Sequence, residues 1–521
     1  MVVFCVLIPQ YTVFVALEVQ PRQIMTLLQR LYSIILNPLY SITSRINERV
    51  RNIYISICCF CLTASFVVYF HSDFELRNER TMVHFVCSII LFALIVFSIK
   101  RPLKPVKWNK LIFYTFFASG LGVFVISFLH PIGDGYRAGY VLVMLGFPCL
   151  YYVWNNRGDY NTLYIRISAS TCLVAILYFI YYANLASKGE LDFLDGRVCA
   201  SFYDPNMFSM IGMVAVNAAL YMILIKRDSV AWYAYTALSM GVGLSIVYLG
   251  GSRLSILVVA ASLFAFAVFY IKTVIIPGGF RPVGLKLMKL AIIIASAAMF
   301  IFAGNFLLSM NNMLAVENAM QAEIEAAADT EAAAQEEQAA APEQAEAAEQ
   351  AEPAASEVPD INQPVDADEN QDVIDRIVSS SDLTTPDSFL SGRLTLWKNY
   401  GQFLNMTGND FSKTDWAVMN ANAPKAKHAH NNFFELGYRC GIPVACINIL
   451  LELFAGIICL IWLFGRKYTD PYYLFCVMAM ACYALESMFD IATIPFERPA
   501  PYFFYMAMIP VFVFRGGKQD Q

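Results

Sequence analysis

The chain has 521 residues, with 36 Lys or Arg against 41 Asp or Glu, which gives a formal net charge of −5. Hydrophobic residues make up 58% of it and charged residues only 15%, whereas an ordinary soluble domain carries about 25% charged residues. A soluble globular protein is therefore excluded, because so few charges cannot cover a water-facing surface of this size. Most of the 13 Cys lie inside apolar runs, where Cys acts as a small hydrophobe rather than as part of a disulfide scaffold.

Apolar runs long enough to cross a bilayer as helices recur along the chain. The sequence predicts twelve membrane-spanning helices, near residues 53–70, 82–98, 111–130, 138–154, 167–183, 207–225, 230–249, 254–276, 290–309, 441–464, 471–486 and 499–514. The predicted fold class is an all-α polytopic helical bundle with one large loop between the ninth and tenth helices. Residues 2–17 are apolar but interrupted by Pro9 and Gln10, with no small-residue cleavage site after them, so we interpret residues 1–52 as a cytoplasmic or interfacial segment.

The distribution of Lys and Arg predicts the orientation of these helices, because short cytoplasmic loops accumulate both residues. With the N-terminus inside, the cytoplasmic segments hold 22 of the 36 Lys and Arg. The other side holds 14, of which seven lie in the one long loop. Both termini, including the tail 515–521, are therefore predicted to be cytoplasmic. The membrane body comprises 53–309 and 441–514, and the loop 310–440 faces outward.

This outer loop differs in composition from the rest of the chain. It contains 23 acidic and seven basic residues, a net charge of −16, which leaves +11 for the remainder. Its segment 316–375 is an acidic, low-complexity stretch rich in Ala, Glu and Gln, which we interpret as a mobile, solvated insertion with patches of transient helix. The triplet Asp366-Ala367-Asp368 matches a metal-binding pattern of nucleotide-sugar enzymes, but in so acidic a run we attribute the match to chance.

The second part of the loop, residues 388–440, carries the first candidate for chemistry. In the run 428–443, Asn432 is followed three residues later by Glu435, which predicts a capping box that starts a helix leading to the tenth span. His430 would then precede a helix N-terminus, where the dipole disfavours imidazolium and attracts anions. Such a site suits a neutral histidine acting as a base beside a phosphate. The local pattern alone also allows a surface histidine near a lipid headgroup. A zinc site at His428 and His430 is disfavoured, because no set of further ligands accompanies them.

Three arginines are predicted on the same outer side. Arg393 begins an amphipathic helix in the run 391–397, Arg253 lies in the Gly-rich turn between the seventh and eighth helices, and Arg197 precedes the sixth helix. An arginine at a membrane boundary often serves as a snorkelling anchor, but the orientation rule disfavours such anchors on the outer face. Guanidinium binds phosphate bidentately and stays charged. A lipid-linked diphosphate at the outer leaflet would account for all three.

Four segments together resemble a known family, the bacterial O-antigen ligases and O-antigen polymerases. The similarity is in their order and spacing and is clearest over residues 190–465. The segments are Tyr-Asp-Pro-Asn at 203–206, Gly-Ser-Arg at 251–253, Ser-Gly-Arg-Leu-Thr-Leu-Trp at 391–397, and His-Asn-Asn-Phe-Phe-Glu-Leu-Gly-Tyr-Arg-Cys-Gly-Ile-Pro at 430–443. The acidic insertion departs from the family pattern, in which the large outer loop is mostly compact.

The resemblance implies a metal-independent membrane glycosyltransferase of the bacterial inner membrane, without a cofactor. It would transfer glycan from undecaprenyl diphosphate to an acceptor sugar hydroxyl on lipid A core, or on another lipid-linked glycan, at the periplasmic face. By the same resemblance, His430 is the catalytic residue, and Arg393, Arg253 and Arg197 bind the donor diphosphate, with Asn431 and Glu435 in support. These residue types suit the chemistry. A hydroxyl nucleophile needs a base that titrates near neutrality, and a departing diphosphate needs positive charge.

The sequence leaves several alternatives open. A ligase and a repeat-unit polymerase share the same donor head, so the donor-side arginines do not separate them. A flippase or transporter of lipid-linked oligosaccharide is a candidate of another class, although acidic residues are nearly absent from the predicted span interiors. A metal-dependent oligosaccharyltransferase would need acidic ligands on an early outer loop, where only Asp73 and Glu75 occur. No nucleic-acid-binding pattern is present. The sugar, the acceptor and any pairing of Cys199 with Cys440 are undetermined.

Overall fold

The structure is a computed structural model of the chain. It describes residues 6–8, 11–13, 21–70, 77–129, 139–140, 142–194, 197–200, 202, 204–225, 229–276, 283–340, 393–409, 429–490, 496 and 498–514. The predicted tail 515–521, the triplet Asp366-Ala367-Asp368, residues 341–375 of the acidic stretch and His428 lie outside these residues.

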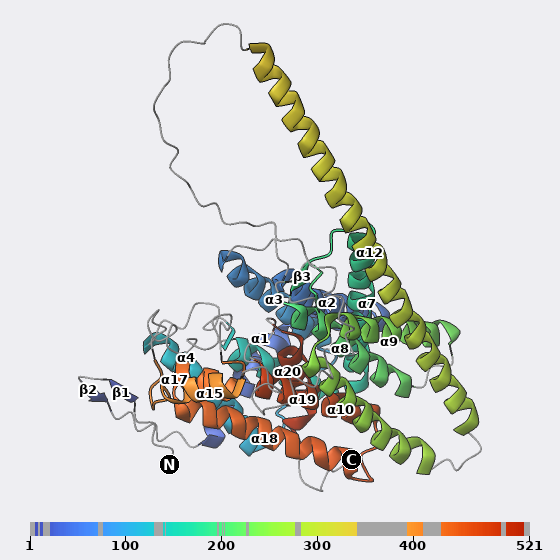
Figure 1. Ribbon diagram of the computed structural model, residues 1–521. Helices are drawn as coiled ribbons and strands as arrows, with labels where there is room; N and C mark the ends of the chain where they lie inside the picture. The colour runs from blue at the N-terminus through green and yellow to red at the C-terminus, as the bar shows by residue number, and fades with distance from the viewer. Residues whose placement is uncertain are drawn as a thin grey trace.

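The described chain is built almost entirely from helices (Figure 1). Before the large loop these are α1 (Pro21–Thr43), α2 (Glu48–Phe70), α3 (Arg77–Ser98), α4 (Lys110–Leu129), η1 (Leu142–Gly146), α6 (Phe147–Arg157), α7 (Tyr160–Ala186), α8 (Pro205–Leu224), α9 (Val230–Gly250), α10 (Arg253–Tyr270), η2 (Ile271–Ile275) and α12 (Val283–Ala340). After it come α15 (Arg393–Gly401), α17 (Asn432–Cys440), α18 (Ile442–Phe464), α19 (Pro471–Phe489) and α20 (Pro499–Val511). Two short antiparallel hairpins complete the described part, β1 (Val6–Ile8) with β2 (Tyr11–Val13) and β3 (Phe193–Leu194) with β4 (Arg197–Val198).

Nine helices within the described residues are long and apolar enough to cross a membrane, which makes the chain an all-α polytopic membrane protein. They are α2, α4, α7, α8, α9, α10 with η2, α12, α18 and α19. The predicted span 82–98 forms a shorter apolar helix within α3. The predicted spans 138–154 and 499–514 fall on short elements instead. Gly146 and Pro148 mark the change from the π-helix η1 to α6, and α20 has only 13 residues.

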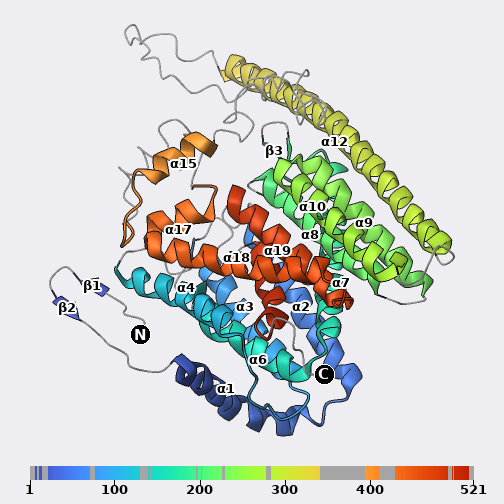
Figure 2. The ribbon, with the colours of Figure 1, turned by 90° about the horizontal axis from the view of Figure 1, so that it is seen from below.

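Helix α8 lies at the centre of the bundle, packed against α7, α9, α10 and α19. Most of its side chains are buried by protein rather than turned toward lipid. Its contact with α9 is a backbone contact, because a Cβ on Gly212 would lie 2.4 Å from the carbonyl oxygen of Gly243. Small residues permit this kind of close approach between membrane helices. Figure 2 shows α12 running across the outer side of this group, with α1 at the opposite edge of the molecule.

One end of the bundle gathers basic residues where several connections meet. Arg51 of α2 donates to the carbonyl of Ile99, just after α3, and Arg157 at the end of α6 pairs with Glu48 at 3.0 Å. Asn109, before α4, donates to a carbonyl just after α20. We call this the basic end. The distribution of Lys and Arg in the sequence predicts that all these segments lie on one side of the membrane.

Helix α12 is longer than the predicted ninth span. It runs without interruption for 58 residues, about 87 Å at 1.5 Å per residue, and passes well beyond the other helices (Figure 1). Asn311 accepts a hydrogen bond from the backbone of Leu191, and Asn318 donates to the carbonyl of Lys188, so the connection after α7 holds α12 at this level. Residues 316–340 of the acidic stretch therefore belong to one continuous helix rather than to separate patches, because Ala, Glu and Gln all favour helix.

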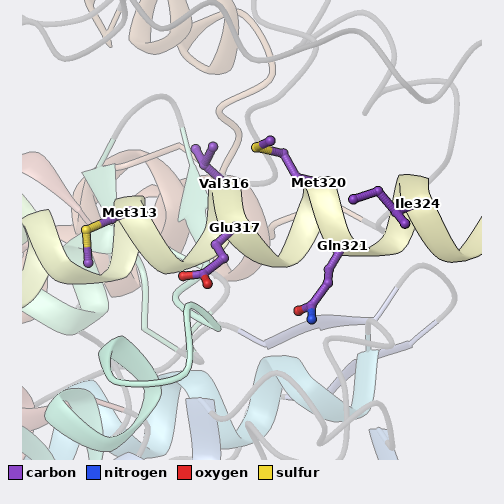
Figure 3. Close-up of a pocket in the computed structure, with 6 residues that line it drawn as sticks. All are labelled: Met313, Val316, Glu317, Met320, Gln321 and Ile324. Carbon is purple, nitrogen blue, oxygen red and sulfur yellow. The ribbon is translucent and has the colours of Figure 1, made fainter.

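A shallow hollow lies along the projecting part of α12 (Figure 3). Its lining residues all come from this one helix and are Met313, Val316, Glu317, Met320, Gln321 and Ile324. Their spacing of three and four residues is that of one helix face. The hollow is thus an open helix surface and contains none of the predicted site residues.

Candidate functional site

His430 lies in the turn that leads into α17. Its backbone φ is +48°, a left-handed conformation that residues other than glycine adopt rarely. Two hydrogen bonds hold the preceding residue, Ala429: its N–H donates to Glu435 at 3.0 Å, and its carbonyl accepts from the indole of Trp397 at 3.0 Å. Helices α17 and α15 therefore hold the turn from two sides, and the direction of His430 is fixed by its surroundings.

Helix α17 is capped by Asn431, not by the predicted Asn432. The backbone of Asn431 is extended, and its side-chain oxygen accepts hydrogen bonds from the amides of Phe433 at 2.9 Å and Phe434 at 3.2 Å. The predicted capping box of Asn432 and Glu435 is therefore wrong by one residue. An N-cap needs extended backbone ahead of the helix, and Asn432 already belongs to the helix.

The two supporting residues each join parts of the site. The carboxylate of Glu435 is buried and accepts hydrogen bonds from Arg439, one helical turn later, and from the amide of Ala429. The side-chain nitrogen of Asn431 donates to the carbonyl of Met488 at 2.9 Å, near the end of α19. Glu435 thus stabilises the turn before α17, and Asn431 links that turn to α19.

The side chain of His430 faces a buried acidic residue, Asp490. His430 Nδ1 lies 3.3 Å from Asp490 Oδ1, and the second carboxylate oxygen of Asp490 pairs with Arg498 at 2.5 Å. Arg498 also lies 3.5 Å from Glu486, one turn before Asp490. The side chain of Asp490 is 4% exposed and that of Glu486 1%. A carboxylate at this position favours the imidazole tautomer with its proton on Nδ1 and its lone pair on Nε2.

Arg498 stays charged in this setting. Burial by itself lowers the pKa of its guanidinium, but the carboxylates of Asp490 and Glu486 outweigh burial and raise that pKa above its usual value. The physical cause is attraction between opposite charges removed from water. Asp490 therefore faces a permanent positive charge on one side and His430 on the other.

The three predicted arginines come close to this pair. Arg393, the first residue of α15, is partly buried, and burial lowers the pKa of its guanidinium. The positive charges of Arg197 and Arg253 lower it further, while the carboxylates of Asp490 and Asp204 oppose the shift. Interactions between charges weaken with distance and are screened by salt. The structure therefore places Arg393, Arg197 and Arg253 near one another and near Asp490, the acidic residue beside His430.

Local geometry explains how two of these arginines reach this position. Arg253 follows a tight turn in which Gly251 has a φ of +55°, a conformation that glycine adopts without strain. A Cβ on Gly250 would lie 2.1 Å from Ser209 in α8, so the turn rests directly on the first residues of that helix. Arg197 donates to Asn206 at 3.3 Å, also at the start of α8. The N-terminus of α8, capped by its preceding aspartate, is the common support.

Asp490 and Arg498 were missed by the sequence analysis, as were Glu486 and Asp204. Asp490 and Arg498 flank the short connection between the last two predicted spans, where charged residues are ordinary boundary residues. Asp204 is the acidic residue of the Tyr-Asp-Pro-Asn run and had been noted only as part of it. The sequence signal that could have identified these four residues was their common position on the side predicted to face outward.

The cysteines and possible metal ligands offer no further chemistry at this site. Cys199 and Cys440 are separate free thiols, and burial raises the pKa of Cys440 to about 12, which keeps it protonated. Within the part of the chain that the structure describes, no three His, Cys, Asp or Glu side chains are grouped as metal ligands would be.

The arrangement combines a histidine with concentrated positive charge. His430 can accept a proton at Nε2 while Asp490 stabilises the imidazolium that forms. Four guanidinium groups, those of Arg197, Arg253, Arg393 and Arg498, can stabilise negative charge on a nearby anion.

In comparisons with known proteins, the chain matches no family model, no curated protein and no solved structure.

Proposed function

We propose that this protein is a membrane glycosyltransferase of the kind that O-antigen ligases represent. It takes glycan from undecaprenyl diphosphate and joins it to an acceptor sugar hydroxyl, on lipid A core or another lipid-linked glycan. The observation that carries this proposal is the His430–Asp490 pair beside four arginines at one end of the bundle. A base and an anion site are the two parts that displacement of a diphosphate by a hydroxyl requires.

The proposed reaction assigns a role to each group. His430 Nε2 removes the proton from the acceptor hydroxyl as its oxygen attacks the anomeric carbon of the donor glycan. The bond between that carbon and the diphosphate oxygen breaks, and undecaprenyl diphosphate leaves with the electron pair. Arg393, Arg253 and Arg197 hold the diphosphate and offset the charge that develops on it. Asp490 orients the imidazole, with Arg498 fixing Asp490 in turn.

We further propose twelve membrane crossings in the bacterial inner membrane, with both termini in the cytoplasm. The support is the excess of Lys and Arg in alternate connections and the gathering of those connections at the basic end. The site residues belong to the other set of connections and would then face the periplasm. Helix α3, η1 with α6, and α20 would supply the three crossings beyond the nine long apolar helices.

Replacement of His430 tests the proposed reaction. We expect His430→Ala to abolish glycan transfer in membranes at an unchanged level of protein. His428→Ala is the matched control, because it removes the other histidine of the same run and should leave transfer intact. Normal surface glycan in the His430→Ala strain would contradict the proposal.

The glycan that accumulates in a deletion strain separates the related functions. Finished polymer left on the lipid carrier supports a ligase, and a single repeat unit on the acceptor identifies a repeat-unit polymerase. Absence of lipid-linked glycan from the periplasm would identify a flippase and refute transfer chemistry. Gel analysis of surface glycan, with and without phenol extraction of the lipid-linked pool, distinguishes the three outcomes.

A further inference from the structure

Helix α18 contains one acidic residue, Glu452, in the middle of an otherwise apolar sequence. Its neighbours on the helix, Ile449 and Leu453, are exposed and would face lipid. A carboxyl group at this position is costly in a bilayer and is expected to have a specific role. The reaction proposed above does not use Glu452.

The carboxyl group of Glu452 is the meeting point of several hydrogen bonds. Ser487 of α19 donates to one oxygen at 2.9 Å, and Asn448 of the same helix donates to the other at 2.7 Å. The side chains of Asn432 and Tyr483 also hydrogen-bond this carboxyl group. Glu452 therefore connects the beginning of α17 to the end of α19 through its own helix.

The two residues that Glu452 connects, Asn432 and Ser487, lie close in sequence to His430 and Asp490. Asn432 follows His430 by two residues, and Ser487 precedes Asp490 by three. The 3.3 Å separation between His430 and Asp490 depends on how the start of α17 is set against the end of α19. A single group bonded to both helices fixes that relation, as the outer-shell partners of a histidine–carboxylate pair do.

We propose that Glu452 is a positioning residue that holds His430 against Asp490. This inference rests on the proposed function for its catalytic consequence, but the geometry it asserts can be measured without any glycan substrate. Glu452 itself touches neither His430 nor a reacting atom. It acts through Asn432 on one side and Ser487 on the other.

The test reads the imidazole of His430 directly. The full chain is labelled with ¹⁵N-histidine, reconstituted in liposomes and examined by solid-state NMR. Its five histidines give five pairs of imidazole nitrogen signals, one for Nδ1 and one for Nε2, and His430 is assigned by the pair that disappears in His430→Gln. In the unaltered protein we expect the tautomer with the proton on Nδ1. Glu452→Leu should convert that signal to a mixture of tautomers, whereas Glu452→Gln, which still bonds to hydroxyl and amide groups, should preserve it.

Two further variants keep the test decisive. Ser487→Ala removes the hydrogen bond from the end of α19 and leaves Glu452 in place, so it should shift the His430 signal in the same direction even if Glu452→Leu does not fold. Ser119→Ala is the control, because its hydroxyl contacts Asn448 at 3.2 Å, outside the link between α17 and α19, and should change nothing. An unchanged His430 signal in both Glu452→Leu and Ser487→Ala would overturn the proposal.

Glycan transfer gives a second readout. We expect Glu452→Leu to lower transfer by about 10- to 100-fold, by analogy with the range for outer-shell partners of metal-bound histidines, with less than about a tenfold loss in Glu452→Gln. If His430→Ala retains transfer while the NMR signals behave as expected, the glycosyltransferase function fails and the positioning inference stands. Equal loss of transfer in Glu452→Leu and Glu452→Gln, with unchanged NMR signals, would show that Glu452 does not act through His430.

Discussion

Substitution of Asp490 by Asn is the most informative single change at the site. Asn has nearly the shape of Asp but carries no charge, so it removes the group that stabilises a protonated His430 while keeping an oxygen for Arg498. Because Asp490 lies 3.3 Å from His430 and pairs with Arg498, the change should affect both the reaction and the packing. The two effects can be separated by measuring glycan transfer and thermal stability in different assays.

The loss of activity can be estimated from the charges. Two unit charges 3.3 Å apart interact by about 5 kcal/mol at an effective dielectric constant of about 20. Arg498 shares the carboxylate and weakens its effect on His430, so we expect a loss of about 3 kcal/mol, or roughly 100-fold in transfer rate. The folding cost should be smaller, about 1–3 kcal/mol, because Arg498 keeps an oxygen acceptor and its contact with Glu486.

Complementation of a deletion strain, with gel quantification of transferred glycan at matched protein level, measures the loss of activity. Thermal unfolding of the purified protein in detergent measures the loss of stability. Asp159→Asn is the matched control, because Asp159 caps α7 at the basic end and Asn caps helices equally well. Asp490→Asn protein that folds normally and transfers glycan at more than half of the unaltered rate would refute the role assigned to Asp490.

The remaining predictions concern other parts of the molecule. Arg393→Lys keeps the charge but loses the bidentate geometry, so the donor concentration for half-maximal transfer should rise about tenfold; an unchanged value would remove Arg393 from the donor site. Trp397→Phe should keep the ring stack on Phe434 and lose the bond to the backbone before His430, lowering the free energy of unfolding by about 1 kcal/mol, and a loss above about 3 kcal/mol would contradict this division. Burial raises the pKa of Cys440 to about 12, so its thiolate is scarce at pH 7–8. Mass spectrometry should therefore find Cys440 unmodified by maleimide in the folded protein at this pH and modified after unfolding. Deletion of residues 327–368, which begins beyond the contact of α12 with the connection after α7, should leave transfer unchanged, and a folded but inactive deletion would assign this stretch a role in acceptor choice.

The helical membrane fold could be predicted because it depends on the length and polarity of apolar runs, which are local properties. Two predicted spans fall on shorter elements than expected. Residues 138–154 are apolar enough, but Gly146 and Pro148 interrupt them, and α20 begins at the predicted Pro499 but ends at Val511, just after Pro510. The length of α12 was missed for the opposite reason. High acidic charge indicated disorder, while the strong helix propensity of Ala, Glu and Gln extends the helix to Ala340.

At the site, His430, Arg393, Arg253 and Arg197 were selected by residue type and predicted side of the membrane. The structure brings them together, although none of their separations could be derived from sequence spacing. The error at Asn431 and Asn432 has a specific cause. Either side chain could cap α17 by local rules; in the structure Asn431 is the cap, and Asn432 lies inside the helix and interacts with Glu452, 20 residues away in sequence.

The acidic residues of the site also explain how it can hold four arginines before any donor arrives. Uncompensated guanidinium groups so close together would repel one another, and burial would add to the cost. Asp490 and Asp204 place negative charge beside these arginines and oppose their mutual repulsion. Four arginines against these two aspartates still leave an excess of positive charge that can attract an anion. The carboxylate of Asp490 thus contacts His430 and also offsets positive charge of the arginines. If the proposed function holds, a change at Asp490 should therefore weaken both proton removal by His430 and binding of the diphosphate.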